Sequence, residues 1–158
     1  MIKNIGISIY DPLQLDNIIP MYDFDIVQSP LNILDRRILD SGWARKLQTK
    51  GIKLHVRSIF LQGLLLMNKE NRDLKFNRWS PLWSEWEDWL SRNNINALSA
   101  CLNFALHSNN VDKVIIGLQN VEQFEEIISS ISNKPLHIPN WSNLLDSNLI
   151  NPSKWSDL

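Results

Sequence analysis

Short β-branched runs alternate with amphipathic segments along the whole chain. Apolar runs of strand length predict four strands, at Ile5–Ile9, Asp25–Gln28, Leu54–Ile59 and Val114–Gly117. The segments between them carry apolar residues at three-to-four spacing, which is typical of helices packed on one face. Because strands alternate with helices, we expect parallel strands joined by right-handed crossovers. The pattern therefore predicts an α/β fold.

Turn and cap residues set the helix boundaries in the first half of the chain. Asp11-Pro12 predicts the start of a helix that runs to about Met21, because an acidic cap and a proline in the first turn favour helix initiation. Its expected inward residues are Leu13, Ile18 and Ile19. Residues 35–50 predict a single helix that ends at Gly51 and has these inward residues: Ile38, Leu39, Trp43 and Leu47.

Three further helices are expected in the second half. One begins at Ser80-Pro81, one runs from about Asn96 to His107, and one begins at Asn120, where Asn120 and Gln123 form a variant of the capping box. Residues 67–78 predict an irregular loop. The proline- and tryptophan-containing tail, residues 135–158, predicts a segment that wraps the surface.

Four tryptophans recur at helical spacing, at Trp79, Trp83, Trp86 and Trp89. Such a stripe belongs either to a buried helix face or to an aromatic binding site. We favour the buried face, because large aromatic side chains contribute most to stability when they are removed from water.

Composition and charge remove several classes of function. The chain has 158 residues, 44% of them hydrophobic, and a net charge of −1, so it offers no basic field for nucleic acid or for a membrane surface. No apolar run is long enough for a transmembrane helix, and the N-terminus lacks the apolar core of a secretion signal. The single Cys101 and the widely spaced His55, His107 and His137 predict no metal site. A reducing cytoplasm is the expected location.

Four segments, taken in order, resemble the aldo/keto reductase family. They are Ile5–Ser8, Ile26–Asn32, His55–Gly63 and Val114–Gly117 with the following Gln123–Glu126. The wording of the third segment is similar to that of reductases from bacterial surface-sugar gene clusters. The resemblance implies the C-terminal half of a (β/α)8 TIM barrel over residues 1–134, with residues 135–158 as an extension. A whole barrel takes about 250 residues, so this chain supplies about half.

The resemblance also implies a nicotinamide dinucleotide site, for NADP or NAD. Ser8 and Gln28 would bind the nicotinamide carboxamide, and Arg57 would stack on its ring. The pyrophosphate would lie against Ser58, Phe60 and Gly63, and the adenosine ribose or its 2′-phosphate against Gly117, Leu118, Gln119 and Gln123. The chain departs from the family at Ile9, where an asparagine is usual, and at Gln119 and Gln123, where lysine or arginine is frequent.

Each assignment has a purely structural alternative. Ser8 and Gln28 could be buried and satisfied by the backbone, Arg57 could form a structural ion pair, and Asn120 could be a helix cap alone.

No residue of this chain matches the family's catalytic motif. The family's tyrosine acid and its lysine, aspartate and histidine partners lie on the first four strands, and neither Tyr10 nor Tyr22 occupies that motif. We therefore expect a partial NAD(P)-dependent aldo/keto reductase that is inactive by itself. The alternative is a non-catalytic half-barrel that self-associates as a binding or interaction module.

A half-barrel leaves two open sheet edges, at Ile5–Ile9 and Val114–Gly117. We expect residues such as Ile7 and Val27 to face the empty barrel centre. The partner at these edges would be a complementary N-terminal half-barrel or a second copy.

Overall fold

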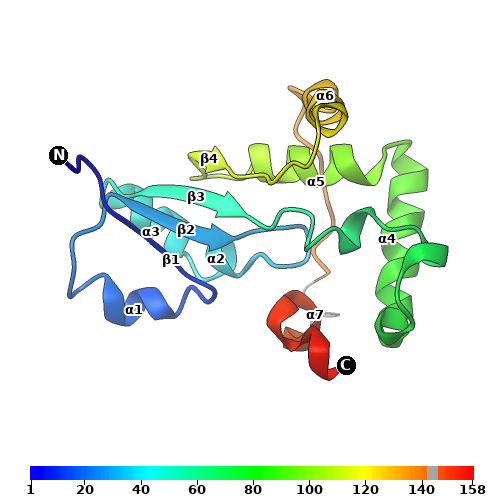
Figure 1. The fold of residues 1–158 in the computed structure, drawn as a ribbon, viewed down its shortest axis with the longest axis horizontal. Helices are drawn as coiled ribbons and strands as arrows, with labels where there is room; N and C mark the ends of the chain where they lie inside the picture. The colour runs from blue at the N-terminus through cyan, green and yellow to red at the C-terminus, as the bar shows by residue number, and fades with distance from the viewer. Residues whose placement is uncertain (142–145) are drawn as a thin grey trace.

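Four parallel strands form one sheet in chain order, β1-β2-β3-β4 (Figure 1). The structure is a computed structural model that describes residues 1–141 and 146–158. The strands are β1 (Gly6–Ser8), β2 (Ile26–Pro30), β3 (Lys53–Arg57) and β4 (Lys113–Val114). The helices are α1 (Gln14–Ile18), α2 (Arg37–Asp40), α3 (Trp43–Thr49), α4 (Ser80–Asn93), α5 (Ala97–Leu106), α6 (Val121–Ser129) and α7 (Ser147–Ile150). The predicted four-stranded α/β half-barrel is confirmed.

Two predicted helices are shorter than expected. Residues 35–50 form α2 and α3 in place of one helix, because Gly42 between them has a φ of 75°. A residue in this left-handed conformation interrupts the helical hydrogen-bond series. α1 spans only Gln14–Ile18, and its fully buried residue is Leu15, whereas Leu13 is 64% exposed. The prediction that Leu13 faces the core is therefore wrong.

Residues 67–78, predicted as an irregular loop, contain the 3-10 helix η2 (Lys69–Asn71) and most of η3 (Leu74–Trp79). A further 3-10 helix, η1 (Leu64–Leu66), precedes this segment. η3 leads directly into α4, and Figure 1 shows α4 beyond the carboxyl ends of the strands. The helices predicted near Asn96 and at Asn120 are confirmed as α5 and α6, and each asparagine caps its helix.

One face of the sheet is buried against helices. Val27, Leu54 and Val56 are fully buried, together with Leu47 of α3 and Ala105 of α5. Ile7 is directly paired with Val27 and packs against the same cluster. The expectation that Ile7 and Val27 face the barrel centre is therefore wrong. In a strand, neighbouring residues point to opposite faces, so it is the alternate residues that face the centre.

The opposite, barrel-facing side carries polar residues. Register places Ser8, Gln28, His55 and Lys113 in one row across the four strands. None of these four residues is buried. This row of the barrel-facing side is polar and is not buried, in contrast to the helix-covered face.

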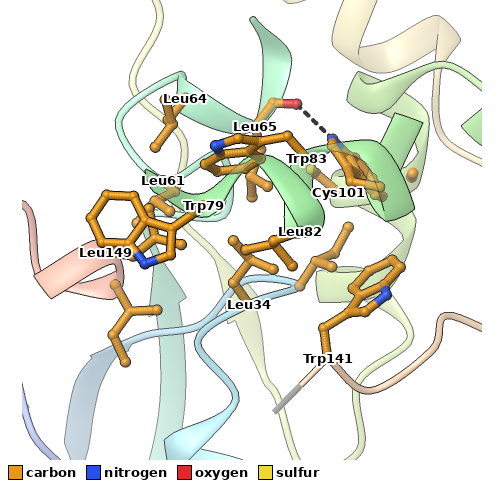
Figure 2. Packing of buried hydrophobic residues seen from close by; sticks show 14 of the residues in the cluster. Leu34, Leu61, Leu64, Leu65, Trp79, Leu82, Trp83, Cys101, Trp141 and Leu149 are labelled. Atoms are coloured by element: carbon orange, nitrogen blue, oxygen red, sulfur yellow. Dashed lines mark hydrogen bonds between the residues drawn. The ribbon is translucent and has the colours of Figure 1, made fainter. Parts of the chain in front are cut away.

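The tryptophans form a second core beyond the strand ends. Trp79, Trp83, Trp86 and Trp89 are all buried, which confirms the buried-face prediction. Trp141 packs edge-on against Trp86 and Trp89, and Figure 2 shows Trp141 and Leu149 in the same cluster as Trp79. The tail therefore contributes to the core, where a surface segment was expected. Residues 142–145 of the predicted extension lie outside the described residues.

β1 and β4 are the outermost strands, as expected for a sheet with two open edges. Exposed large apolar residues lie near both edges of the sheet, at β1 and at β4. At the β1 end they include Ile5, Tyr10 and Leu13, and at the β4 end Ile115, Leu118, Val121, Phe124 and Ile128. No residue of α6 is buried, although the helix is amphipathic. The apolar face of α6 is thus largely uncovered.

Candidate functional site

A cleft of about 890 Å³ opens at the carboxyl ends of β3 and β4. It lies between the segment that follows β3 and the start of α6, and we call it the β3–β4 cleft. In folds with parallel strands, ligands bind at this edge of the sheet. Eight of the ten predicted cofactor residues line it: Arg57, Ser58, Phe60, Gly63, Gly117, Leu118, Gln119 and Gln123.

The loop after β3 has an unusual backbone. Ser58, Leu61, Gln62 and Gly63 all have positive φ, at 60°, 48°, 55° and 85°. Outside glycine this conformation is costly, and it persists where the surrounding structure imposes it, often at ligand sites. The sequence indicated this freedom only at Gly63.

This loop also contains backbone donors that have no acceptor among the described residues. The N–H groups of Ile59, Phe60, Gln62 and Gly63 have no acceptor in the described part of the chain, and all four residues line the cleft. Successive N–H groups around left-handed residues form concave sites that bind anions. The arrangement is therefore chemically suited to a phosphate group.

A helix N-terminus borders the other side of the cleft. The Gln123 N–H donates to Asn120 Oδ1 at 2.9 Å, and the Gln119 N–H donates to Gln123 Oε1 at 3.0 Å. The predicted cap is thus present, and it occupies the Gln123 side chain. The N–H groups of Val121 and Glu122 have no acceptor among the described residues. The first turn of α6 adds a positive dipole end to this side of the cleft.

The remaining two predicted residues do not line the cleft. Ser8 and Gln28 are direct neighbours on β1 and β2, on the barrel-facing side of the sheet. Ser8 is exposed and Gln28 half-buried, and neither side chain hydrogen-bonds to another described residue. The alternative of two buried, satisfied side chains is therefore wrong, and both side chains remain free for a ligand.

Arg57 lies between these two groups. Its Nη1 donates to Ser58 Oγ at 3.2 Å, and its Nη2 donates to the Ile9 carbonyl at 3.3 Å. The guanidinium also stacks 4.7 Å from the centroid of the Tyr10 ring. Among the described residues no carboxylate pairs with Arg57, so the ion-pair alternative is wrong. These contacts fix the position of the Arg57 guanidinium at the carboxyl end of the sheet.

A second cavity, of about 380 Å³, lies on the other side of Arg57. It shares Arg57, Ser58 and Gln62 with the β3–β4 cleft, and its far wall comes from the tail, including Asn151 and Ser153. Arg37 also lines this cavity, and its hydrogen bonds to Asp35 raise its pKa. The two cavities are thus adjacent across a single arginine.

The described residues give no support for a metal site or for a reactive thiol. Within residues 1–141 and 146–158, no three histidine, cysteine or acidic side chains gather as a metal site. Burial raises the pKa of the Cys101 thiol, which disfavours the reactive thiolate. In the same residues no helix is both long and apolar enough to cross a membrane.

Comparison with known proteins agrees with the fold. The sequence matches the aldo/keto reductase family over residues 1–147. Two solved structures with a similar fold are the holo and apo forms of the aldo-keto reductase AKR11C1 from Bacillus halodurans. Both are 20% identical in sequence and cover 84% of this chain, with TM-scores of 0.59 and 0.60. A comparison with curated proteins finds no significant match.

This chain spans less than half of each solved structure, namely 45% of the holo form and 46% of the apo form. The four strands and their helices thus correspond to part of a barrel. Together with the match over residues 1–147, this shows that the chain belongs to the aldo/keto reductase family.

Proposed function

We propose that this chain is the dinucleotide-binding half of an NAD(P)-dependent aldo/keto reductase. The observation that carries the proposal is the left-handed loop after β3, in which four residues that line the β3–β4 cleft have N–H groups without an acceptor among the described residues. A pyrophosphate supplies the acceptors that such a loop lacks. Family membership supports a nicotinamide dinucleotide as the source of that pyrophosphate.

Each part of the dinucleotide has candidate residues. The pyrophosphate would lie between the loop with Ser58, Phe60 and Gly63 and the first turn of α6. The adenosine would lie along residues 117–123, and the nicotinamide would extend past Arg57 toward Ser8 and Gln28. Bound there, the cofactor would supply or accept a hydride. The chain's own groups bind and orient it.

The reaction itself requires residues beyond these. Carbonyl reduction needs an acid that protonates the developing alkoxide, a contribution of roughly 10²–10⁴-fold. By family resemblance that acid lies on the other half of the barrel, so we propose that this chain alone does not reduce carbonyl compounds. Turnover with NADPH or NADH that survives repurification and is lost in Gln28→Ala would contradict this.

We further propose that a complementary four-stranded half-barrel covers the two sheet edges. The support is the gathering of exposed apolar side chains at both ends of the sheet, such as Tyr10 and Leu13 at β1 and Leu118 and Phe124 beside β4. A self-associating, non-catalytic module remains the second candidate, because the same edges could meet those of a second copy.

Calorimetry with ADP-ribose tests the cleft assignment. Gly63 has a φ of 85°, so Gly63→Ala strains the loop and displaces its N–H groups. Gly51 has a φ of 74° and does not line the cleft, so Gly51→Ala is a matched control with a similar strain of about 1–2 kcal/mol. We expect Gly63→Ala to weaken binding at least tenfold and Gly51→Ala to leave it unchanged. Equal affinities in both variants would remove the loop from the site.

A further inference from the structure

One row of side chains on the barrel-facing side of the sheet has no partner within the chain. In register from β1 to β4, the row consists of Ser8, Gln28, His55 and Lys113. Among the described residues, none of these four side chains takes part in a hydrogen bond or an ion pair. The row ends at β4 in an exposed ammonium group, that of Lys113. These groups are therefore satisfied only by water or by another molecule.

The sheet itself offers no carboxylate to Lys113. The residues of the four strands include Lys53, Arg57 and Lys113 but no aspartate or glutamate. The acid next to Lys113 in sequence, Asp112, is already occupied. Its Oδ1 lies 2.9 Å from Lys53 Nζ, and its Oδ2 accepts from the Leu54 N–H at 2.9 Å. The strands thus carry an excess of positive charge.

Closure of the barrel would remove this row from water, because side chains fill the interior of an eight-stranded barrel. A buried polar side chain is costly without a hydrogen-bond partner, and a buried ammonium group without a counter-charge is far more costly. Whatever covers this side of the sheet must therefore supply a carboxylate for Lys113 and polar partners for the rest of the row.

A second copy does not meet this requirement. It would bring the same four strands in the same order, and hence the same row and no carboxylate. In a barrel built from two copies, each β4 would lie opposite the other β4 across the interior. Two Lys113 ammonium groups would then be buried together without a counter-charge, which disfavours closure. The apolar sheet edges can still associate in arrangements that leave the row in water.

From this arrangement we infer that the barrel-facing side of the sheet accepts a half-barrel of different sequence. That partner carries a carboxylate at an inward-facing strand position within reach of Lys113, and a second copy of this chain does not close over the row. The inference rests on the proposed half-barrel partner and names its chemistry. Complementary charge of this kind selects one partner over others. It favours the complementary half-barrel over the self-associating module.

Labelling of lysine amines, read by mass spectrometry, tests the inference on the full chain, because it reports the accessibility of Lys113 itself. The probe for a partner with an inward carboxylate is the Lys113→Glu variant, added in excess to an isotopically marked unmodified chain. We expect this variant to slow the labelling of Lys113 at least about tenfold, since its carboxylate permits closure over the ammonium group.

The matched control is an equal excess of the Lys134→Glu variant. It makes the same change of charge at an exposed lysine outside the strands. With this variant, and with the unmodified chain alone at concentrations where it self-associates, the labelling rate of Lys113 should stay within about twofold of its value in dilute solution.

Two results would overturn the inference. If self-association of the unmodified chain alone protects Lys113 about tenfold, two copies close despite their shared charge. If the Lys113→Glu variant protects Lys113 no more than the Lys134→Glu variant does, a carboxylate does not determine what covers the row. Either result leaves the dinucleotide assignment standing, because calorimetry with ADP-ribose tests the β3–β4 cleft separately.

Discussion

The Arg57 guanidinium stacks 4.7 Å from the centroid of the Tyr10 ring, at the boundary between the two cavities. Tyr10 follows the end of β1, and Arg57 is the last residue of β3. The stack fixes the plane of the guanidinium, and a fixed planar cation can stack on a second flat ring, such as nicotinamide.

The first prediction separates the nicotinamide end from the pyrophosphate. Arg57→Ala should weaken NAD⁺ binding about fivefold and leave ADP-ribose binding nearly unchanged, because ADP-ribose lacks the ring that Arg57 would contact. Calorimetry with both ligands measures the two effects. Arg78→Ala is the control, since Arg78 stacks on Trp79 at 4.9 Å and does not line the cleft. Equal losses for the two ligands would place Arg57 elsewhere.

The second prediction concerns the tryptophan core. Trp86 is 2% exposed, stacks on Trp89 and donates from Nε1 to the Leu65 carbonyl at 3.3 Å. Trp86→Ala should lower the free energy of unfolding by about 3–5 kcal/mol, because it leaves a cavity and an unpaired carbonyl. Denaturant unfolding measures this, with Leu74→Ala as the exposed control.

The C-terminal tail, residues 135–158, should also contribute to the free energy of unfolding. Trp141→Ala removes the edge-on contacts with Trp86 and Trp89, and we expect it to lower the same unfolding free energy by more than 1 kcal/mol. A Trp141→Ala protein as stable as the unmodified chain would mean that the tail is not part of the cooperative core.

The third prediction concerns pH. Partial burial opposes ionisation of Asp112, but the hydrogen bonds from the Lys53 ammonium and the Leu54 N–H outweigh it and lower the pKa of Asp112. A carboxyl whose pKa is lower in the folded state stabilises the fold above its unfolded pKa. That stabilisation is lost as the pH falls through the folded pKa.

Asp112→Asn should therefore destabilise the protein at about pH 6 and have a smaller effect as the pH falls toward about 2. Unfolding by urea at the two pH values checks this, with Asp16→Asn as the control at an exposed site. A difference that is the same at both pH values would show that the Lys53–Asp112 pair does not cause it.

The fourth prediction concerns assembly. Apolar surface left in water costs about 25 cal/mol per Å², against a typical stability of about 5–15 kcal/mol. We therefore expect the isolated chain to self-associate or to require a complementary half-barrel. Light scattering should give a mass above that of a monomer, and Phe124→Lys should lower it. Leu74→Lys, at an 81% exposed residue away from the sheet edges, should not. A monomer at micromolar concentration would mean that the edges need no partner.

The sequence predicts the sheet better than its surroundings. β-branched runs locate all four strands, and the Asn120–Gln123 cap locates α6. Gly42 breaks one predicted helix because its left-handed conformation overrides an apolar period that continues through it. Tail residues such as Trp141 are too sparse in a polar segment to indicate burial, which depends on contacts with α4 that are distant in sequence.

The sequence likewise predicts only part of the candidate site. Family resemblance selects eight residues that line one cleft, because the motifs follow the strand ends. It does not indicate the positive φ of Leu61 and Gln62, since neither residue favours that conformation by itself. It also does not indicate that Glu126 lines the cleft, because this depends on which face of α6 borders the cleft.

The most direct test of the central claim is the response of individual backbone amides to ADP-ribose, measured by nitrogen–proton NMR. If the pyrophosphate lies against the loop after β3, the amide protons of Ile59, Phe60, Gln62 and Gly63 shift downfield together as they acquire an acceptor, while the amide of Gly51 does not move. If ADP-ribose leaves these four amides unchanged, or shifts only amides outside the β3–β4 cleft, the chain does not hold a dinucleotide there.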